Sequence, residues 1–121
     1  MKVLLDHMSV PVHSKTETAQ FYAEVFGVPA DGPRARSGWL TLSDALSLIF
    51  EEGDVREKNH YAFRVEPGDF DALLERARGL GLPLGSSADN PDGQIKSRPD
   101  RSRSFYFSDP NGHGVELITA E

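Results

Sequence analysis

The sequence predicts an α+β fold made of two similar halves, each consisting of a strand, a helix and then further strands. Two observations lead to this prediction. A histidine followed by residues that suit a strand occurs twice, in LDHMSVPV near the start and in KNHYAFRV in the middle. A Gly-x-Pro motif that can stop a helix follows each of them, at Gly27 and again at Gly81. Repeated spacing of this kind indicates an internal duplication.

The first helix is expected over about residues 15–26. Ser14 and Glu17 form the S-x-x-E pattern of a capping box, in which each side chain satisfies a free backbone N–H of the first turn. Gly27 can adopt the left-handed conformation that ends a helix, and Pro29 prevents the helix from continuing.

The second helix is expected in the second half, before Gly81 and Pro83. Its evidence is a set of apolar residues at three- and four-residue steps, which places them on one helical face. These residues are Phe70, Leu73, Leu74, Ala77 and Leu80.

Short runs with strand character complete each half. Aligning the shared Ser-Asp of WLTLSDALSLIF with that of FYFSDPNGHGVELI places Ser47 opposite Glu116. The segment from Gly85 to Ser104 is dominated by Ser, Asn, Asp, Pro and Gly, so we expect a loop with little regular structure there. The strand runs are Trp39 to Leu42, Leu46 to Glu51, Phe105 to Phe107 and Val115 to Thr119.

Composition excludes several functions. The 121 residues correspond to one domain, and the absence of cysteine excludes disulfides, thiolate metal sites and a cysteine nucleophile. A net charge of −6 disfavours nucleic acid as a partner. No apolar run is long enough for a membrane span, and the N-terminal one is too short for a signal peptide. We therefore expect a soluble cytoplasmic protein with no membrane partner.

One segment departs from the acidic average. KSRPDRSR, from Lys96 to Arg103, carries four basic residues and a single acidic one. It is either a solvated loop or a basic lid over an anionic small molecule, and the sequence leaves both interpretations open.

Strand alternation separates the polar residues from the apolar ones, because successive side chains point to opposite faces. The faces that carry Met8 and Phe63 should pack on the helices. His7, His60 and Glu116 then share the other face of their strands, each flanked by a small residue: Ser9, Ala62 and Gly114 respectively.

Two imidazoles and a carboxylate suit a divalent transition metal, and three protein ligands leave positions open for water or substrate. A histidine on a strand is often only a hydrogen-bonded side chain. The matched positions of His7 and His60 in the repeat favour a metal site instead. His13 and His113 are expected to be surface or turn residues and not ligands.

Together, the two strand histidines, HYAF and the terminal FYFSDPNGHGVELI resemble the vicinal oxygen chelate (glyoxalase/bleomycin-resistance/dioxygenase) superfamily. The resemblance covers the chain as a single domain over residues 1–121, with module one at about 1–54 and module two at about 55–121. It implies two βαβββ modules that form a curled mixed sheet around a metal cleft. It also implies a homodimer, and one divalent metal per site (Fe, Mn, Zn or Ni) held by His7, His60 and Glu116.

The implied activity is that of a metal-dependent lyase, dioxygenase or transferase that chelates a small oxygen-rich molecule through two of its oxygens. Glyoxalase I enzymes use a fourth ligand in the strand where Ser47 was aligned. A serine there favours a three-ligand site, as in extradiol dioxygenases and fosfomycin-resistance thiol transferases. The thiol transferases share HYAF and SFYF-x-DP-x-GH, and the positions they use to hold a phosphonate fall near Ser9, Lys96 and Tyr106.

Two questions remain open: the role of Tyr106, and whether the protein is an enzyme or a binding protein. Tyr106, with Glu116, is a candidate catalytic residue and substrate contact, although core packing explains an aromatic strand residue equally well. A non-catalytic drug-binding protein is the second class of function. Bleomycin-binding relatives generally lack the two histidines and the glutamate, which this chain retains.

Overall fold

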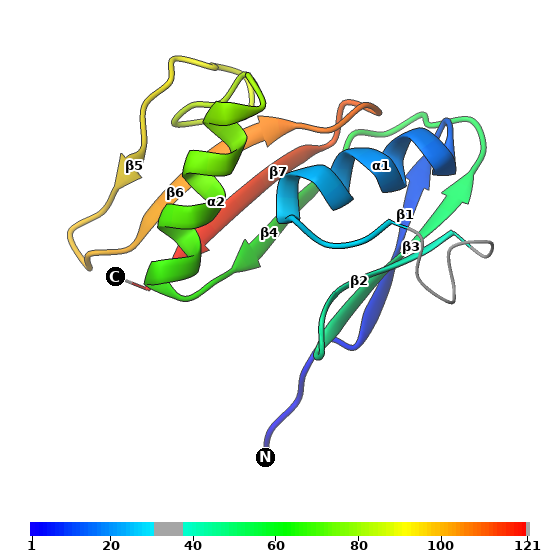
Figure 1. Ribbon diagram of the computed structural model, residues 1–121, viewed down its shortest axis with the longest axis horizontal. Helices are drawn as coiled ribbons and strands as arrows, with labels where there is room; N and C mark the ends of the chain where they lie inside the picture. Colours follow the sequence, from blue (N-terminus) through cyan, green and yellow to red (C-terminus); the bar gives the residue numbers. More distant parts are fainter. Residues whose placement is uncertain (31–37, 121) are drawn as a thin grey trace. The chain divides into compact units, whose positions relative to one another are not determined.

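The computed structural model describes residues 1–30 and 38–120 of the chain. It divides into two compact units, Met1–Arg56 and Glu57–Glu121 (Figure 1). Each unit combines one helix with one β-sheet, so the predicted α+β class is confirmed. None of the helices in the described ranges is long and apolar enough to cross a membrane.

The first unit holds a three-stranded sheet in the order β1-β3-β2. β1 pairs in parallel with β3, and β2 pairs antiparallel with β3. Its elements are β1 (His7–Val12), α1 (Lys15–Phe26), β2 (Trp39–Ser43) and β3 (Leu46–Glu52). Among the described residues, two strands therefore follow this helix, where the βαβββ module that the family resemblance implies has three.

Helix α1 begins and ends as its sequence predicts. The Ser14 hydroxyl accepts a hydrogen bond from the backbone N–H of Glu17 at 3.2 Å. Gly27 closes the helix with φ 69°, a left-handed conformation that glycine adopts without a steric penalty.

The core of the first unit follows the predicted alternation along β1. Val10 and Val12 are fully buried, whereas His7 and Ser9 are exposed on the other face. The ring of Tyr22 from α1 stacks on Phe50 of β3, with 5.7 Å between centroids. β1 therefore has one apolar face and one polar face, and the polar face carries the predicted site residues His7 and Ser9.

The second unit holds a four-stranded sheet in the order β4-β7-β6-β5. β4 is parallel to β7, and the remaining pairs are antiparallel. This unit shows the complete strand–helix–three-strand order. Its elements are β4 (His60–Arg64), α2 (Pro67–Gly79), β5 (Lys96–Ser97), β6 (Arg103–Ser108) and β7 (Gly114–Thr119).

The predicted apolar stripe of α2 is correct except at its end. Phe70, Leu74 and Ala77 are buried, and Phe70 meets Phe105 of β6 edge to face at 5.4 Å. Leu80 was expected to extend the stripe but is 47% exposed. The helix ends at Gly79, and Leu80 is the residue that caps it, at the exposed end of the last turn.

The segment 85–104 has little regular structure, as predicted, but specific hydrogen bonds order it. Gly85 pairs with Tyr106 of β6 through both backbone groups, at 3.0 and 2.9 Å. The carboxylate of Asp92 accepts bonds from the backbone N–H groups of Ser86 and Gln94, at 3.1 and 2.9 Å. This part of the chain is therefore fixed against the strand that carries Tyr106.

Candidate metal centre

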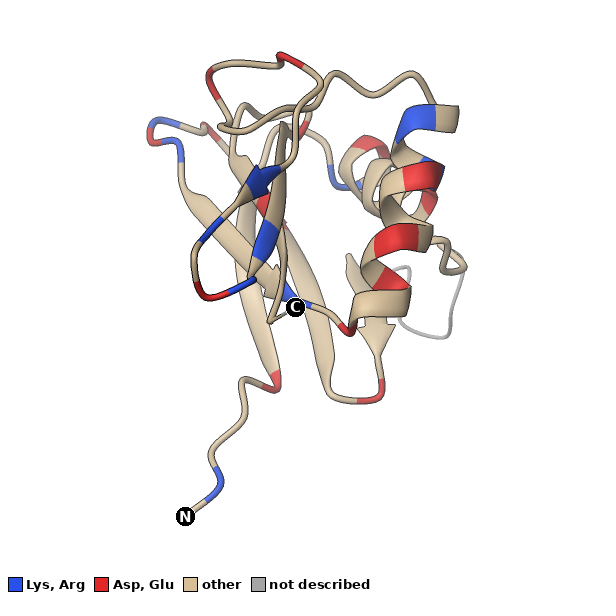
Figure 2. Ribbon diagram, turned by 90° about the vertical axis from the view of Figure 1, so that its left-hand side faces the viewer, with Lys and Arg blue, Asp and Glu red and all other residues tan. Residues whose placement is uncertain are grey.

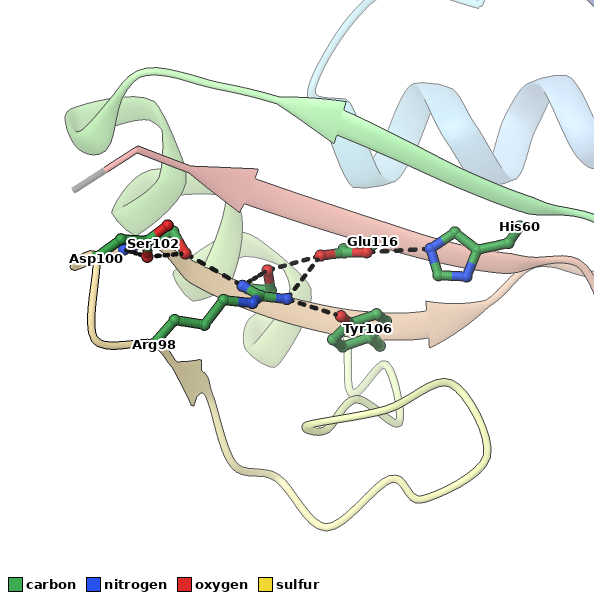
Figure 3. Close-up of polar contacts among 7 residues, drawn as sticks. His60, Arg98, Asp100, Ser102, Tyr106 and Glu116 are labelled. Atoms are coloured by element: carbon green, nitrogen blue, oxygen red, sulfur yellow. Dashed lines mark hydrogen bonds and ion pairs between the residues drawn. The ribbon is translucent and has the colours of Figure 1, made fainter.

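Two of the three predicted metal ligands come together in the second unit. His60 begins β4, and Glu116 lies in the parallel neighbour β7, where its pairing partner is Ala62. His60 Nε2 is 3.0 Å from Glu116 Oε1 (Figure 3). The His60 side chain is 55% exposed and that of Glu116 10%, so the pair opens to solvent on the histidine side.

The spacing of these two atoms fits a shared metal ion. Donor atoms that each lie about 2.1 Å from one ion in tetrahedral geometry are about 3.4 Å apart, which is close to the separation of this hydrogen-bonded pair. Within residues 1–30 and 38–120, no group of three His, Asp or Glu side chains is close enough to hold an ion. His60 and Glu116 therefore form a two-residue half-site, and a third ligand must be argued separately.

The predicted third ligand, His7, begins β1 in the first unit. Its Nδ1 lies 2.8 Å from the Asp6 carboxylate, which leaves Nε2 as the available ring nitrogen. Metal-binding histidines commonly have one ring nitrogen held by a carboxylate in this way. Its place in the site remains a prediction from the repeat, since no distance to His60 or Glu116 supports it.

The strand register supports the equivalence of the two histidines. Each has an aromatic side chain beside its ring: Trp39 lies 5.2 Å from His7, and Tyr106 lies 6.0 Å from His60. In β3 and β7 the residues paired with these aromatics are Ile49 and Glu116. The same arrangement of strand histidine and neighbouring aromatic thus occurs once in each unit.

This register corrects the alignment of Ser47 with Glu116. His7 pairs with Ser47, and His60 pairs with Gly114, so Ser47 corresponds to Gly114. The position equivalent to Glu116 is Ile49. The Ser-Asp motif misleads because Ser43 lies beyond a bulge in β2, whereas Ser108 is still paired within β6. Ile49 has no atom that can bind a metal, so the fourth-ligand position is apolar.

The Glu116 carboxylate is held at both oxygens. Oε2 accepts a 2.7 Å bond from the buried Ser104 hydroxyl and a longer, 3.4 Å contact from Arg98 Nη2. Burial raises the pKa of Glu116, but hydrogen bonds from Ser104, His60 and Tyr106 outweigh it, so the net pKa lies below the usual value. The carboxylate is therefore ionised at neutral pH, as a metal ligand must be.

Arg98 and Ser104 are the site residues that the sequence analysis did not single out. Arg98 Nη1 donates to the hydroxyls of Ser104 at 2.9 Å and Ser102 at 3.4 Å, and Nη2 donates to the Tyr106 hydroxyl at 3.2 Å (Figure 3). The signal for Arg98 was the basic segment itself. Ser104 could have been found from its two-residue spacing to Tyr106 on the same strand.

Tyr106 faces Glu116 as its cross-strand partner and is 8% exposed. Burial and the neighbouring Glu116 carboxylate raise the pKa of its hydroxyl, and Arg98 lowers it less. The hydroxyl is therefore protonated at neutral pH and acts as a hydrogen-bond donor and not as a base.

A small pocket of about 120 Å³ borders this strand. Ligand sites for whole small molecules are usually several hundred Å³, so this pocket is too small to be one, and its lining includes neither His60 nor Glu116. Its lining is largely apolar: Leu82, Pro83, Ala88, Pro91, Tyr106, Phe107 and Ser108.

The two remaining predicted substrate contacts are placed differently. Ser9, in the first unit, donates from its hydroxyl to Glu51 at 2.9 Å. Lys96 lies in β5 with an exposed side chain, and its backbone pairs with Ser104. Neither placement tests a substrate contact, so both stay predictions.

The basic segment contains both internal and solvated cations. Figure 2 shows its Lys and Arg residues along β5 and the turn into β6. Arg98 points into the Glu116 cluster, and Arg103 pairs with Asp71 at 3.0 Å and covers the Phe70 ring. Arg101 and Lys96 are exposed. The four basic side chains therefore do not form a lid in which all of them face one ligand.

His113 corrects one expectation. It does lie in the turn before β7, but it is fully buried and not at the surface. Asp109 accepts bonds from the backbone N–H groups of Asn111 and His113, at 2.8 and 3.0 Å, which turns the chain inward. The His113 ring then accepts the Asn59 N–H at 3.0 Å, so its role is structural. His13 is exposed, as predicted.

This two-unit α+β fold, with a histidine and a carboxylate on paired strands, is that of the vicinal oxygen chelate superfamily. The chain belongs to the glyoxalase-like domain family, whose model matches residues 6–118. The resemblance noted in the sequence is thereby confirmed.

Similar proteins include enzymes of two kinds. The glutathione transferase FosA of Serratia marcescens is 27% identical over 120 residues, which cover 93% of this chain and 78% of that protein. The metallothiol transferase FosB of Shouchella clausii is 25% identical over 121 residues, covering 95% and 79%. The structure of oxidase ChaP-H1 superposes with a TM-score of 0.78 and 31% identity, covering 98% of this chain and 96% of that one.

Proposed function

We propose that this protein is a metal-dependent enzyme that holds one divalent metal per site and binds a small oxygen-rich substrate through two of its oxygens. The proposed ligands are His7, His60 and Glu116, and the candidate ions are Fe, Mn, Zn and Ni. The observation that carries the proposal is the 3.0 Å approach of His60 Nε2 to an ionised, anchored Glu116. A relative whose name includes metallothiol transferase supports it.

When bound, such a metal acts as a Lewis acid that stabilises negative charge developing on the substrate oxygens. The residues of this chain prepare that chemistry. Ser104 holds one carboxylate oxygen of Glu116 at 2.7 Å and leaves the other facing His60. The protonated Tyr106 hydroxyl donates its hydrogen bond to the same carboxylate, which helps to keep Glu116 ionised.

Two reaction classes fall within this proposal. Oxidation is supported by the likeness to an oxidase over nearly the whole of both chains. Thiol transfer to a fosfomycin-like substrate is supported by the likeness to a glutathione transferase and to a fosfomycin resistance protein, and exposed Lys96 would suit an anionic group on such a substrate. Non-catalytic binding of a small molecule is the remaining alternative.

Reconstitution separates these possibilities. The protein is stripped with a chelator, loaded with each of the four metals in turn, and assayed for dioxygen uptake with vicinal oxygenated aromatics and for glutathione consumption with fosfomycin. We expect turnover in one assay, dependent on metal and abolished by Glu116→Gln but not by His13→Ala. Tight binding of these ligands without turnover under any metal would favour the binding protein.

We also propose that the protein is a homodimer, as the family resemblance implies. β1 is one edge of the sheet in the first unit, and β4 is one edge of the sheet in the second. Strand edges are usually covered or protected, and a second copy of the chain is one way to cover them. Sedimentation at micromolar concentration should give a dimer, and a monomer alone would contradict this part of the proposal.

A further inference from the structure

Arg98 is an internal cation rather than a surface one. Its side chain is 28% exposed, and its two terminal nitrogens make four contacts. A guanidinium has five N–H donors, so protein acceptors engage most of the hydrogen-bond donors of Arg98. These acceptors are Ser102, Ser104, Tyr106 and Glu116.

Hydrogen bonds in the turn between β5 and β6 fix the backbone at Arg98. The Arg98 N–H donates to the carbonyl of Ser102 at 3.1 Å, and the Arg101 N–H donates to the carbonyl of Arg98 at 3.0 Å. Asp100 Oδ1 accepts from both the N–H and the hydroxyl of Ser102, at 2.9 and 2.7 Å. Figure 3 shows this chain of contacts running from Asp100 to His60.

Arg98 reaches the predicted metal ligand by two routes. One is the direct 3.4 Å contact from Nη2 to Glu116 Oε2. The other runs through Ser104, whose hydroxyl oxygen accepts from Nη1 at 2.9 Å and whose hydroxyl donates to the same Oε2 at 2.7 Å. Both routes end on one carboxylate oxygen, and the other oxygen, Oε1, faces His60.

We propose that Arg98 is a positioning residue for the metal centre. Together with Ser104 it fixes Glu116 Oε2, so that Oε1 points at the place where His60 Nε2 also points. This inference rests on the proposed metal-dependent function. Hydrogen-bonded partners of metal ligands typically change metal affinity about 10- to 100-fold when they are removed.

The competing role for Arg98 is an anion clamp that binds substrate directly. The contacts argue against it, because a clamp needs donors free to meet the substrate, and four contacts already engage both terminal nitrogens. A clamp would also leave metal affinity unchanged when Arg98 is replaced. The two roles therefore separate in a binding experiment that contains no substrate.

The test measures zinc affinity of the whole protein by competition with a chromophoric chelator. Arg98→Ala should weaken zinc binding about 10- to 100-fold. Arg98→Lys should weaken it less, since a lysine keeps the charge but cannot span several acceptors. Arg101→Asn removes the same charge from an exposed position of the same turn, and asparagine tolerates its left-handed φ of 71°. It should bind zinc like wild type.

Chemical rescue adds a readout that a general loss of structure would not produce. Millimolar guanidinium should restore part of the zinc affinity of Arg98→Ala, and the same concentration of sodium chloride should not. If Arg98→Ala does not fold by circular dichroism, Ser104→Ala and Arg98→Lys take its place, and both should weaken zinc binding.

The outcomes separate this inference from the function on which it rests. Wild type that binds no metal, or His60→Ala that binds as tightly as wild type, would overturn the proposed metal site itself. Wild-type binding that is lost in His60→Ala but unchanged in the Arg98 variants would overturn only the positioning role. Equal losses in Arg98→Ala and Arg101→Asn would also overturn it, because net charge would then explain the effect.

Discussion

Ile49 occupies in β3 the register position that Glu116 occupies in β7. Ile49 pairs with Ser9, two residues after His7, and Glu116 pairs with Ala62, two residues after His60. The two units therefore share a strand register but not the same candidate metal ligands. The repeat supplies a histidine twice and a carboxylate once.

The first prediction follows from Ile49. Isomerisation of the methylglyoxal–glutathione adduct, which in glyoxalase I enzymes relies on a carboxylate at or beside the metal, should be absent or very slow. Isoleucine can neither bind the metal nor accept a proton, and the carboxylate of the proposed site, Glu116, is itself a proposed metal ligand and is held by Ser104. A kcat/KM of about 10⁶ M⁻¹s⁻¹ or more with any of Ni, Zn, Mn or Fe would contradict this.

The second prediction concerns Gly85→Ala. A Cβ at this position would lie 2.2 Å from the carbonyl oxygen of Asn90 and 2.6 Å from the backbone nitrogen of Asp92, so the loop would have to open. Overpacking of this kind typically costs about 1–3 kcal/mol, measured here by urea unfolding. Gly79→Ala is the control, because nothing lies within 4 Å of its added Cβ. Equal stability of the two variants would refute the tight loop.

The third prediction concerns pH and Asp92. Hydrogen bonds from the Gln94 backbone, and then from the side chain and backbone of Ser86, lower the pKa of this carboxyl below its ordinary value of 3.8. A lowered folded-state pKa means that the carboxylate contributes stability above the unfolded-state pKa and loses it as the pH falls through the folded-state pKa.

Amide exchange over residues 86–94 measures this effect. The exchange rates are corrected for their intrinsic dependence on pH. In wild type, protection from exchange should then decrease as the pH drops below 3.8. In Asp92→Asn the protection should already be reduced at pH 6. Protection in the variant that matches wild type at pH 6 would show that the carboxylate does not organise the loop.

The fourth prediction concerns His113, which is fully buried and accepts the Asn59 N–H. His113→Ala should destabilise the protein by about 2–4 kcal/mol, because it leaves a cavity and an unsatisfied buried donor. At denaturant concentrations too low to unfold the variant, it should bind as much zinc per chain as wild type. A loss of metal from a folded His113→Ala protein would mean that this histidine is a ligand after all.

Much of the fold was predictable because local rules determine it. Ser14 and Gly27 bound the first helix at the positions that their capping chemistry requires. Alternation along β1 placed His7 and Ser9 opposite the buried Val10, as it does in any half-buried strand.

The residues that sequence reasoning missed depend on contacts far apart in the chain. Ser47 was matched with Glu116 because a shared dipeptide does not reveal a bulge in β2. His113 is buried by a turn that Asp109 organises, which its polar neighbours did not indicate. Arg98 reaches Glu116 only because β5 folds back beside β6, a pairing of two residues that no local pattern specifies.

The central claim is a metal site made of His7, His60 and Glu116, and elemental analysis tests it most directly. Wild type, His7→Ala, His60→Ala, Glu116→Gln and the control His13→Ala are purified alike, loaded with zinc and desalted, and their zinc is measured against protein. We expect about one zinc per chain in wild type and His13→Ala, and little in the other three variants. Equal zinc in all five proteins would contradict it.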